Sequence, residues 1–303
     1  MMNFPVKAML LLTGLLFFAV KPTAAQIPQL KHAYNFKDGT ANDRIGGAHG
    51  VLQGGAVIEN GALVTSSAVQ YLELPAGQIK INTYKALSLE AYVTAQKGNA
   101  VHTMLSYFGG SQNGNGVNYI YQSLKNGGGS KTSLVGKNLQ NPWDTETSLM
   151  SRTLEDGEKH HLVTTFDDKE LRFYIDGVLV GSKSVEFQPD NKIANLSNEL
   201  AFLCKGGYNV DPAWQGQVYE FNIYEGVLDA ATISASAQKY IPHLDLKQRA
   251  AFLKSTPSDL VVDASGELAK GVKGKGVFFA EVIPTELDQN NLIDAYLCLS
   301  DGP

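Results

Sequence analysis

The sequence predicts an all-β fold, a two-sheet antiparallel sandwich, on the basis of three observations. Across residues 30–240, short apolar runs show the period-two alternation of strands with one buried face. Gly, Asn and Asp separate these runs at roughly ten-residue intervals, a spacing typical of sandwiches and barrels. Helical periodicity is confined to one short segment near the end of this span. Many short strands with turns between them bury their apolar faces as two packed sheets.

The predicted strands follow the apolar runs in chain order. Before the central region they cover residues 32–36, 62–64, 70–74, 86–94, 103–108, 119–123 and 132–135, and after it residues 199–204 and 217–224. Two stretches between them, residues 109–118 and 125–130, are rich in Gly and Asn and are expected to form surface loops. Such loops are either places where a binding site is built or simple hairpin ends.

The clearest strand signal lies in residues 160–187, which are expected to form three antiparallel strands in a row. Asp176 and Gly177 separate the second and third strands and supply the positive φ angles that a two-residue hairpin turn needs. His160 and His161 are adjacent on the first strand. They therefore point to opposite faces and do not bind one metal ion together.

Three stretches carry motifs in a characteristic order. Residues 34–63 contain a strand and an Asp-x-x-Gly loop, residues 160–182 read HHLVTTFDDKELRFYIDGVLVGS, and residues 214–240 form a strand followed by a helical segment. Together they resemble laminin-G-like domains of the concanavalin A-like lectin/glucanase superfamily. The resemblance implies a jelly-roll form of the sandwich. It leaves the activity open, because one fold supports many functions.

Two helices are expected near the end of the span and beyond it. Residues 229–240 form the first, with Asp229 as N-cap, and residues 246–254 form a short amphipathic one. The composition changes after Pro242, so the chain divides into a laminin-G-like domain over residues 26–240 and a C-terminal extension over residues 241–303. The extension is expected to be either a small appended β-rich subdomain or extra strands that pack on the sandwich.

Residues 1–25 have the pattern of a secretory signal peptide. Lys7 precedes an uncharged run over residues 8–20, and small residues lie before Gln26. The run is too short for a bilayer, so a membrane anchor is the weaker alternative. Cleavage would leave 278 residues with a formal charge of −7, and a secreted, periplasmic or cell-surface location is expected. A mildly acidic chain without a basic stripe has no electrostatic basis for holding nucleic acid.

The two cysteines, Cys204 and Cys298, are far apart in the sequence. In a secreted protein they could form a disulfide that ties the extension to the sandwich. Two buried reduced thiols are the equal alternative.

The family resemblance implies a calcium site between the opening loop and the closing strand. The matching positions are Asp43, carbonyl groups near Gly46 or His49, and Glu220. Calcium prefers carboxylate and carbonyl oxygens from loops. The alternative is a loop that needs no ion.

Aromatic residues in loops are the candidates for binding a glycan, because sugars stack their C–H faces on rings. Trp143 and Trp214 both lie in loops with Pro and Asp, and Tyr208 and Asn209 precede the second. These four residues form the predicted ligand-binding set. Trp214 has a competing role, since the family often packs an aromatic residue under the closing strand.

The evidence for catalysis is weaker. Glucanases of the superfamily carry Glu-x-Asp-x-x-Glu on one strand, and Glu220, Asn222 and Glu225 have that spacing without the central carboxylate. Residues 202–209, FLCKGGYN, only faintly resemble a strand of polysaccharide lyases. The sequence therefore predicts a secreted, non-catalytic recognition module for glycans, assisted by calcium. The alternatives are a polysaccharide-degrading enzyme and a domain that adheres to a cell-surface protein.

Overall fold

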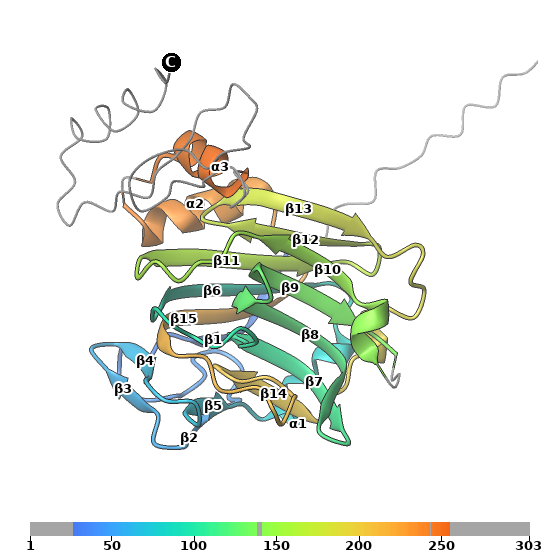
Figure 1. Ribbon diagram of the computed structural model, residues 1–303, viewed down its shortest axis with the longest axis horizontal. Coiled ribbons are helices and arrows are strands. Elements are labelled where there is room, and N and C mark those ends of the chain that lie inside the picture. Colours follow the sequence, from blue (N-terminus) through green and yellow to red (C-terminus); the bar gives the residue numbers. More distant parts are fainter. Residues whose placement is uncertain (1–26, 138–140, 243, 255–303) are drawn as a thin grey trace, which may run out of the picture.

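The fold is a sandwich of two antiparallel sheets packed face to face (Figure 1). The computed structural model describes residues 27–137, 141–242 and 244–254. Over this part of the chain the predicted two-sheet antiparallel sandwich is confirmed. The expected signal peptide, Cys298 and the extension beyond residue 254 lie outside the described residues.

Sheet A has eight strands in the described chain, in the order β13-β12-β11-β6-β15-β4-β3, with β1 also paired to β15. Their bounds are β1 (Gln29–Tyr34), β3 (Val57–Glu59), β4 (Ala62–Thr65), β6 (Leu87–Ala95), β11 (Lys159–Phe166), β12 (Glu170–Ile175), β13 (Val178–Ser184) and β15 (Gly216–Glu225). The predicted meander is confirmed as β11, β12 and β13. Its turn has Asp176 at φ 51° and Gly177 at φ 78°, the left-handed pair that the sequence required.

Sheet B has seven strands in the described chain, in the order β10-β9-β8-β7-β14-β5-β2. Their bounds are β2 (Val51–Gln53), β5 (Tyr71–Glu73), β7 (Ser106–Gln112), β8 (Asn115–Asn126), β9 (Gly129–Val135), β10 (Thr147–Ser151) and β14 (Leu200–Leu203). The expected loops over residues 109–118 and 125–130 are wrong, because strands continue through most of both stretches. Backbone pairing holds these strands together even where Gly and Asn replace apolar side chains.

The core lies between the sheets and is built from the inward residue of each alternation. Its largest fully buried side chains include Trp214, Tyr34, Phe36, Phe108, Phe166, Phe173 and Phe221. Phe108 of sheet B stacks on Phe221 of sheet A with ring centroids 6.0 Å apart. Each such ring stabilises the fold by about 2–3 kcal/mol through the apolar area that it buries.

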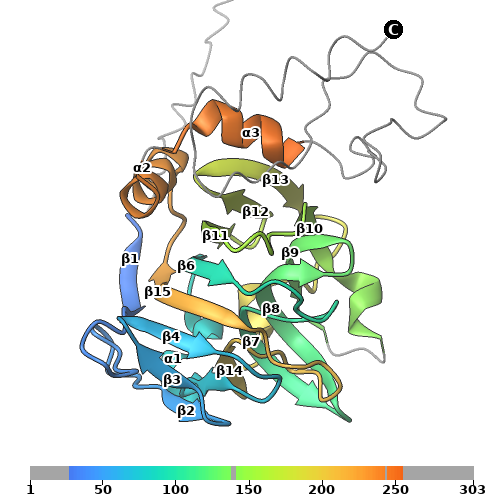
Figure 2. The same cartoon turned by 60° about the vertical axis from the view of Figure 1, so that its left-hand side comes forward.

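Helix α2 (Ala230–Tyr240) lies on the outer face of sheet A (Figure 2). Asp229 is confirmed as its N-cap, since its side chain accepts a 2.7 Å hydrogen bond from the Thr232 N–H. Ile233 packs with Leu228 and Val163 in a small apolar cluster against this face. One outer face of the sandwich is therefore closed by a helix.

Helix α3 (Leu246–Lys254) packs against the sandwich. Leu253 is buried in the main core cluster, and Phe252 packs against the same cluster. Arg249 places its Nε 3.2 Å from the buried carboxylate of Asp176. Residues of α3 therefore contact the core although the helix lies beyond Tyr240, and the domain boundary at Tyr240 stays a prediction.

The remaining described elements are short: α1 (Ala76–Ile79) and the 3-10 helices η1 (Ile81–Thr83), η2 (Pro142–Thr145) and η3 (Ile193–Asn195). Strands β2, β3 and β10 had no sequence signal, since three to five residues carry too little alternation. Among the described residues no helix has the length and hydropathy needed to cross a membrane.

Candidate functional site

Sheet B carries tyrosines on its outer face, away from the core. On β8, Tyr119 and Tyr121 point outward, while Ile120 between them belongs to the main core. Tyr107 on β7 joins them, with its ring centroid 5.5 Å from that of Tyr119. All three tyrosines are almost completely buried, so segments outside the sheet cover them.

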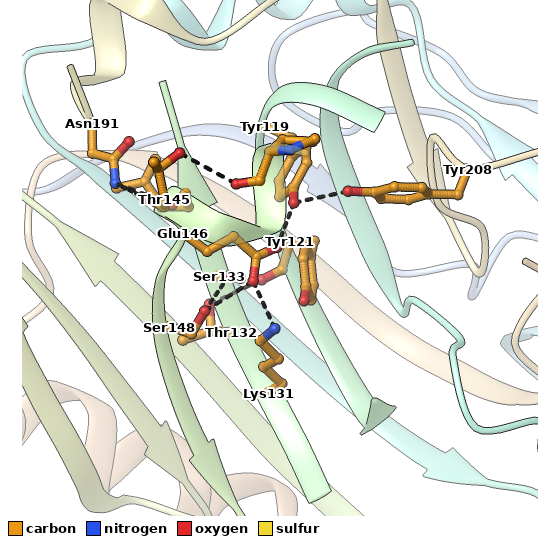
Figure 3. Close-up of polar contacts among 12 residues, drawn as sticks. Tyr119, Tyr121, Lys131, Thr132, Ser133, Thr145, Glu146, Ser148, Asn191 and Tyr208 are labelled. Atoms are coloured by element: carbon orange, nitrogen blue, oxygen red, sulfur yellow. Dashed lines mark hydrogen bonds and ion pairs between the residues drawn. The ribbon is translucent and has the colours of Figure 1, made fainter. Parts of the chain in front are cut away.

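Two such segments meet over this face. Tyr208, in the segment after β14, places its hydroxyl 2.9 Å from that of Tyr119 (Figure 3). Trp143, in η2, lies beside Tyr208 with ring centroids 6.4 Å apart and planes inclined by 43°. Trp143 is 48% exposed. We call Trp143 and Tyr208 the platform, an aromatic surface open to solvent.

The carboxylate of Glu146 lies next to the platform at the start of β10. It accepts hydrogen bonds from the Tyr119 hydroxyl, from Lys131 Nζ at 2.7 Å and from Ser148 Oγ at 3.0 Å (Figure 3). The hydroxyl oxygens of Ser148 and Ser133 are 2.6 Å apart. A polar network therefore runs across β8, β9 and β10 beside the aromatic surface.

The protonation states of Tyr119 and Tyr208 determine which hydroxyl donates each hydrogen bond in this network. Burial, followed by the Glu146 charge, raises the pKa of Tyr119 far above its usual value. Burial also raises the pKa of Tyr208, to about 12. Both phenols keep their protons at neutral pH. Tyr119 donates its proton to Glu146, so Tyr208 donates to Tyr119 and presents its own oxygen as an acceptor.

Asn191 holds the segment that carries Trp143 and Glu146 in place. Its buried amide donates to the Thr145 carbonyl and to the Thr147 hydroxyl, both at 3.0 Å. Its Oδ1 accepts from the Gly136 N–H at 2.9 Å. Figure 3 shows Asn191 meeting Thr145 from outside sheet B. These hydrogen bonds connect the junction between η2 and β10 to the end of β9, and so hold the segment that carries Trp143 in place.

The sequence of this chain matches the model of a known protein family. A family model described as "Concanavalin A-like lectin/glucanases superfamily" matches residues 66–234, more than half of the chain. The chain belongs to this superfamily. The predicted family resemblance is thus confirmed, and with it the concanavalin A-like form of the sandwich. No curated protein matches the sequence.

Several solved structures share this concanavalin A-like fold at low sequence identity. One is domain 4 of the extracellular GH43 arabinanase AbnA from Geobacillus stearothermophilus, solved in complex with arabinotriose, at 19% identity and a TM-score of 0.54. The alignment covers 70% of this chain and 99% of that domain. A second is the receptor-binding domain of a botulinum neurotoxin C/D mosaic serotype, at 14% identity and a TM-score of 0.50, covering 70% and 51%. At these identities the likeness establishes the fold alone.

Two of the four predicted ligand-binding residues come together in the structure. Trp143 and Tyr208 form the platform. Asn209 is exposed and lies at the tip of the β7–β8 hairpin, where its N–H donates to the Gly114 carbonyl at 2.9 Å. It is a neighbour of the platform along the chain.

Trp214 is wrong as a ligand-binding residue. It is fully buried in the main core, and its carbonyl accepts a 2.9 Å hydrogen bond from Thr65 Oγ1. A Cβ on Gly216 would lie 2.4 Å from the Trp214 ring. The ring thus packs against the closing strand, which is the competing role that the sequence allowed.

The predicted calcium ligands do not form a site that fits the ion. The Asp43 carboxylate accepts hydrogen bonds from five N–H groups: Ala33, Ile45, Gly46 and Ala48 at 3.0 Å, and His32 Nδ1 at 2.7 Å. Gly46 thus faces this carboxylate with its N–H. Glu220 is engaged elsewhere, accepting from Asn222 Nδ2 at 2.9 Å. Burial alone would raise the pKa of Asp43, but these donors lower it to about 2. Asp43 is filled by donors, so it acts as a loop anchor.

Calcium binding by the protein stays a prediction. Within the described residues, no group of three or more His, Cys, Asp or Glu side chains has the arrangement of a metal site.

The carboxylates with glucanase-like spacing do not face each other. Glu220 and Asn222 share the outer face of β15, where the two side chains are hydrogen-bonded. Glu225 is five residues from Glu220 and lies on the opposite face of the strand, where it pairs with Lys31 at 3.5 Å. A glycosidase needs both carboxyl groups on the two sides of one bond. This strand does not supply such a pair.

A second buried carboxylate, Glu90 on β6, lies beneath α2 on the outer face of sheet A. It accepts hydrogen bonds from His161 Nε2 at 2.8 Å, Asn222 Nδ2 at 3.0 Å, Tyr224 at 2.9 Å and Ser236 at 2.5 Å. The neighbouring His160 points the other way and contacts Asp156 and Asp176. The prediction that the adjacent histidines serve opposite faces is confirmed.

Sequence reasoning missed most of the polar residues beside the platform. Tyr119 and Tyr121 flank Ile120 in a strand that was predicted, so their outward direction could have been found from the alternation. Glu146 and Asn191 could not, because each acts through partners that are distant in the sequence.

Proposed function

We propose that this chain is a non-catalytic carbohydrate-binding module that binds its glycan over Trp143 and Tyr208 on the outer face of sheet B. The observation that carries the proposal is the platform itself, an exposed indole beside a hydrogen-bonded phenol. Tyr and Trp are enriched at interfaces because each combines a large apolar ring with a polar group. A sugar ring offers a matching apolar C–H face.

The polar groups beside the platform could form hydrogen bonds that orient a bound sugar. Tyr208 donates its proton to Tyr119, so its oxygen is available to accept a hydrogen bond from a ligand. Ser148 donates its proton to Glu146 and likewise offers its oxygen as an acceptor. A pocket with apolar walls and a few placed polar groups is the usual design for small-ligand recognition. Glu146 and Lys131 hold these groups in position by pairing with each other.

The structural neighbours support a binding role. The arabinanase domain was solved with arabinotriose, and the neurotoxin domain is described as receptor-binding. Neither is close enough in sequence to transfer its ligand residue by residue. The predicted signal peptide over residues 1–25 supports a location outside the cytoplasm, where polysaccharides are found.

A glycan array on residues 26–303, followed by calorimetry on the best ligand, tests the proposal. Trp143→Ala should weaken the affinity at least tenfold, as expected for a central aromatic contact. Tyr219→Ala, which removes a partly exposed aromatic ring from sheet A, is the matched control and should leave the affinity within twofold. Binding that survives Trp143→Ala would place the ligand elsewhere.

The enzyme alternative is tested by incubating the protein with laminarin, lichenan and alginate and assaying reducing ends and unsaturated uronates. We expect no turnover, because Glu220 and Glu225 lie on opposite faces of β15. Turnover that Glu220→Gln abolishes would replace the binding proposal with catalysis.

A further inference from the structure

We propose that the platform selects neutral glycans and discriminates against anionic ones, such as uronate- or sialate-bearing chains. This inference rests on the proposed function and names the chemical class of its ligand. Three features carry it: a neutralised lysine, a set of carboxylates around the platform, and basic side chains that are engaged elsewhere.

Lys131 is the cation closest to the site network, and its charge is already matched. Its Nζ lies 2.7 Å from Glu146 Oε2, and the two side chains are only 16% and 6% exposed. The same ammonium group lies over the Tyr121 ring at 5.7 Å. A ligand carboxylate would have to break this buried pair to reach Lys131, and breaking a buried ion pair is strongly unfavourable.

Three carboxylates lie around the platform. Asp144 is exposed and directly follows Trp143 in η2. Asp211 is part of the turn after Tyr208, where its N–H donates to the Tyr208 carbonyl at 3.3 Å. Glu199 is exposed at the start of β14, and its Oε2 accepts from the Ser111 N–H at 3.4 Å. The charges of Asp211 and Glu199 reach the aromatic face, since they contribute to the raised pKa values of Tyr208 and Tyr107 respectively.

The other basic side chains described on this side of the molecule have partners of their own. Lys137 pairs with Asp190 at 3.0 Å, and Lys205 lies 4.3 Å from the centroid of the Tyr71 ring. His102 is close enough to Asp211 to act on its pKa. Glu146 and Lys131 cancel, so the formal charge around the platform is negative.

The expected discrimination follows from Coulomb's law with water as the main medium. A ligand carboxylate about 10 Å from each of three acids loses roughly a factor of two in affinity per acid at low ionic strength. The combined effect is about fivefold to tenfold. It should fall steeply with salt, because the screening length shortens from about 30 Å at 0.01 M to about 3 Å at 1 M.

The test compares pairs of probes that differ only in charge or in one charged unit. The pairs are methyl-esterified and de-esterified galacturonan oligomers, xylo-oligosaccharides with and without a glucuronic acid branch, and lactose against sialyllactose. Binding to residues 26–303 is measured at 10 mM and 500 mM NaCl. The neutral member should bind at least fivefold more tightly at low salt, and the gap should close at high salt.

A variant with Asp144→Asn, Asp211→Asn and Glu199→Gln should narrow the gap to about twofold at low salt. Glu59→Gln, which removes an exposed charge from β3 in the other sheet, should not change it. Melting curves confirm that each variant is folded. The wild-type salt dependence tests the inference even if the triple variant does not fold.

The outcomes separate the two proposals. An anionic member that binds as well as its neutral partner at low salt overturns this inference and leaves the glycan-binding function standing. A gap that the triple variant leaves unchanged also overturns it. If no probe of either charge binds, the proposed function itself fails.

Discussion

The outer faces of the two sheets each hold a buried carboxylate within a ring of phenols and hydroxyls, yet only one is open to a ligand. On sheet A, Glu90 is 4% exposed and lies beneath α2 with four side-chain donors. On sheet B, Glu146 has three side-chain donors and lies beside Trp143, which is 48% exposed. The two carboxylates have similar hydrogen-bond partners, but different segments pack over them.

The comparison shows that the segment packed over a buried carboxylate determines whether its hydrogen bonds contribute to stability alone or also support an exposed surface. Helix α2 seals Glu90 from solvent, so its donors connect neighbouring strands of sheet A and, through Ser236, tie the helix to the sheet. The short η2 segment seals Glu146 only in part, so the same kind of network ends at an exposed aromatic surface. A carboxylate under a helix is therefore expected to act on stability, whereas one under a short turn is expected to act on binding.

The largest expected effect comes from Glu90→Ala. It would leave four donors without this acceptor, of which those of His161 and Asn222 are buried, so the free energy of unfolding should fall by at least about 3 kcal/mol. Glu146→Ala should cost less, about 2 kcal/mol, because it vacates three donors rather than four and the Lys131 side chain is 16% exposed, so its ammonium can reach water. Urea unfolding measures both. A loss below about 1 kcal/mol for Glu90→Ala, or equal losses, would break the comparison.

Helix α3 is the second cover, and removing it should have the next largest effect. A chain ending at Tyr240 loses Leu253 from the core and Arg249 from Asp176, so we expect it to fold with about 2–4 kcal/mol less stability than one ending at Lys254. Thermal unfolding of the two fragments provides the measurement. Equal melting temperatures would support the boundary at Tyr240.

The histidine beneath α3 predicts a loss of stability at alkaline pH. Burial alone would lower the pKa of His160, but Asp176 and Asp156 raise it to about 9. Because the folded pKa lies above the unfolded value, this contribution is complete below about pH 6.5 and disappears as the pH rises through 9. We expect a loss on the order of 2 kcal/mol between pH 6.5 and 9.5. The change should be much smaller in His160→Gln, and an equal change there would assign the effect to other groups.

The smallest expected effect is that of calcium on the Asp43 loop. Five N–H donors already fill this carboxylate, so a chelator should move the melting temperature by less than about 1 °C. Asp43→Asn should instead lower the melting temperature with or without calcium, because it weakens the loop anchor. A chelator shift of several degrees that Asp43→Asn abolishes would restore the ion at this position.

More of the fold than of the site could be predicted, because strands and turns are indicated by residues close together in the sequence. Period-two alternation and the Asp176-Gly177 turn depend on neighbours in the sequence, and the structure confirms both. Trp143 and Trp214 look alike in the sequence, since each lies in a loop with Pro and Asp. Tertiary packing buries Trp214 in the main core and leaves Trp143 48% exposed. Glu146 sits in a polar stretch before β10, and its partners Tyr119 and Lys131 lie on β8 and β9, 27 and 15 residues away in the sequence.

The pairing of the first strand with the last has a practical consequence for presenting the molecule on a surface. Gln29 lies opposite Glu225, and Pro28 is so close to Gly226 that no side chain would fit between them. The chain therefore enters the sandwich beside the point from which it leaves for α2. In Figures 1 and 2, α2 and the short helix that carries Trp143 lie on opposite sides. A tag joined ahead of Ile27 would attach the protein to a support on the side opposite the platform, so that the platform faces the solution. Under the proposed function, this orientation favours multivalent binding of several immobilised copies to one polymer.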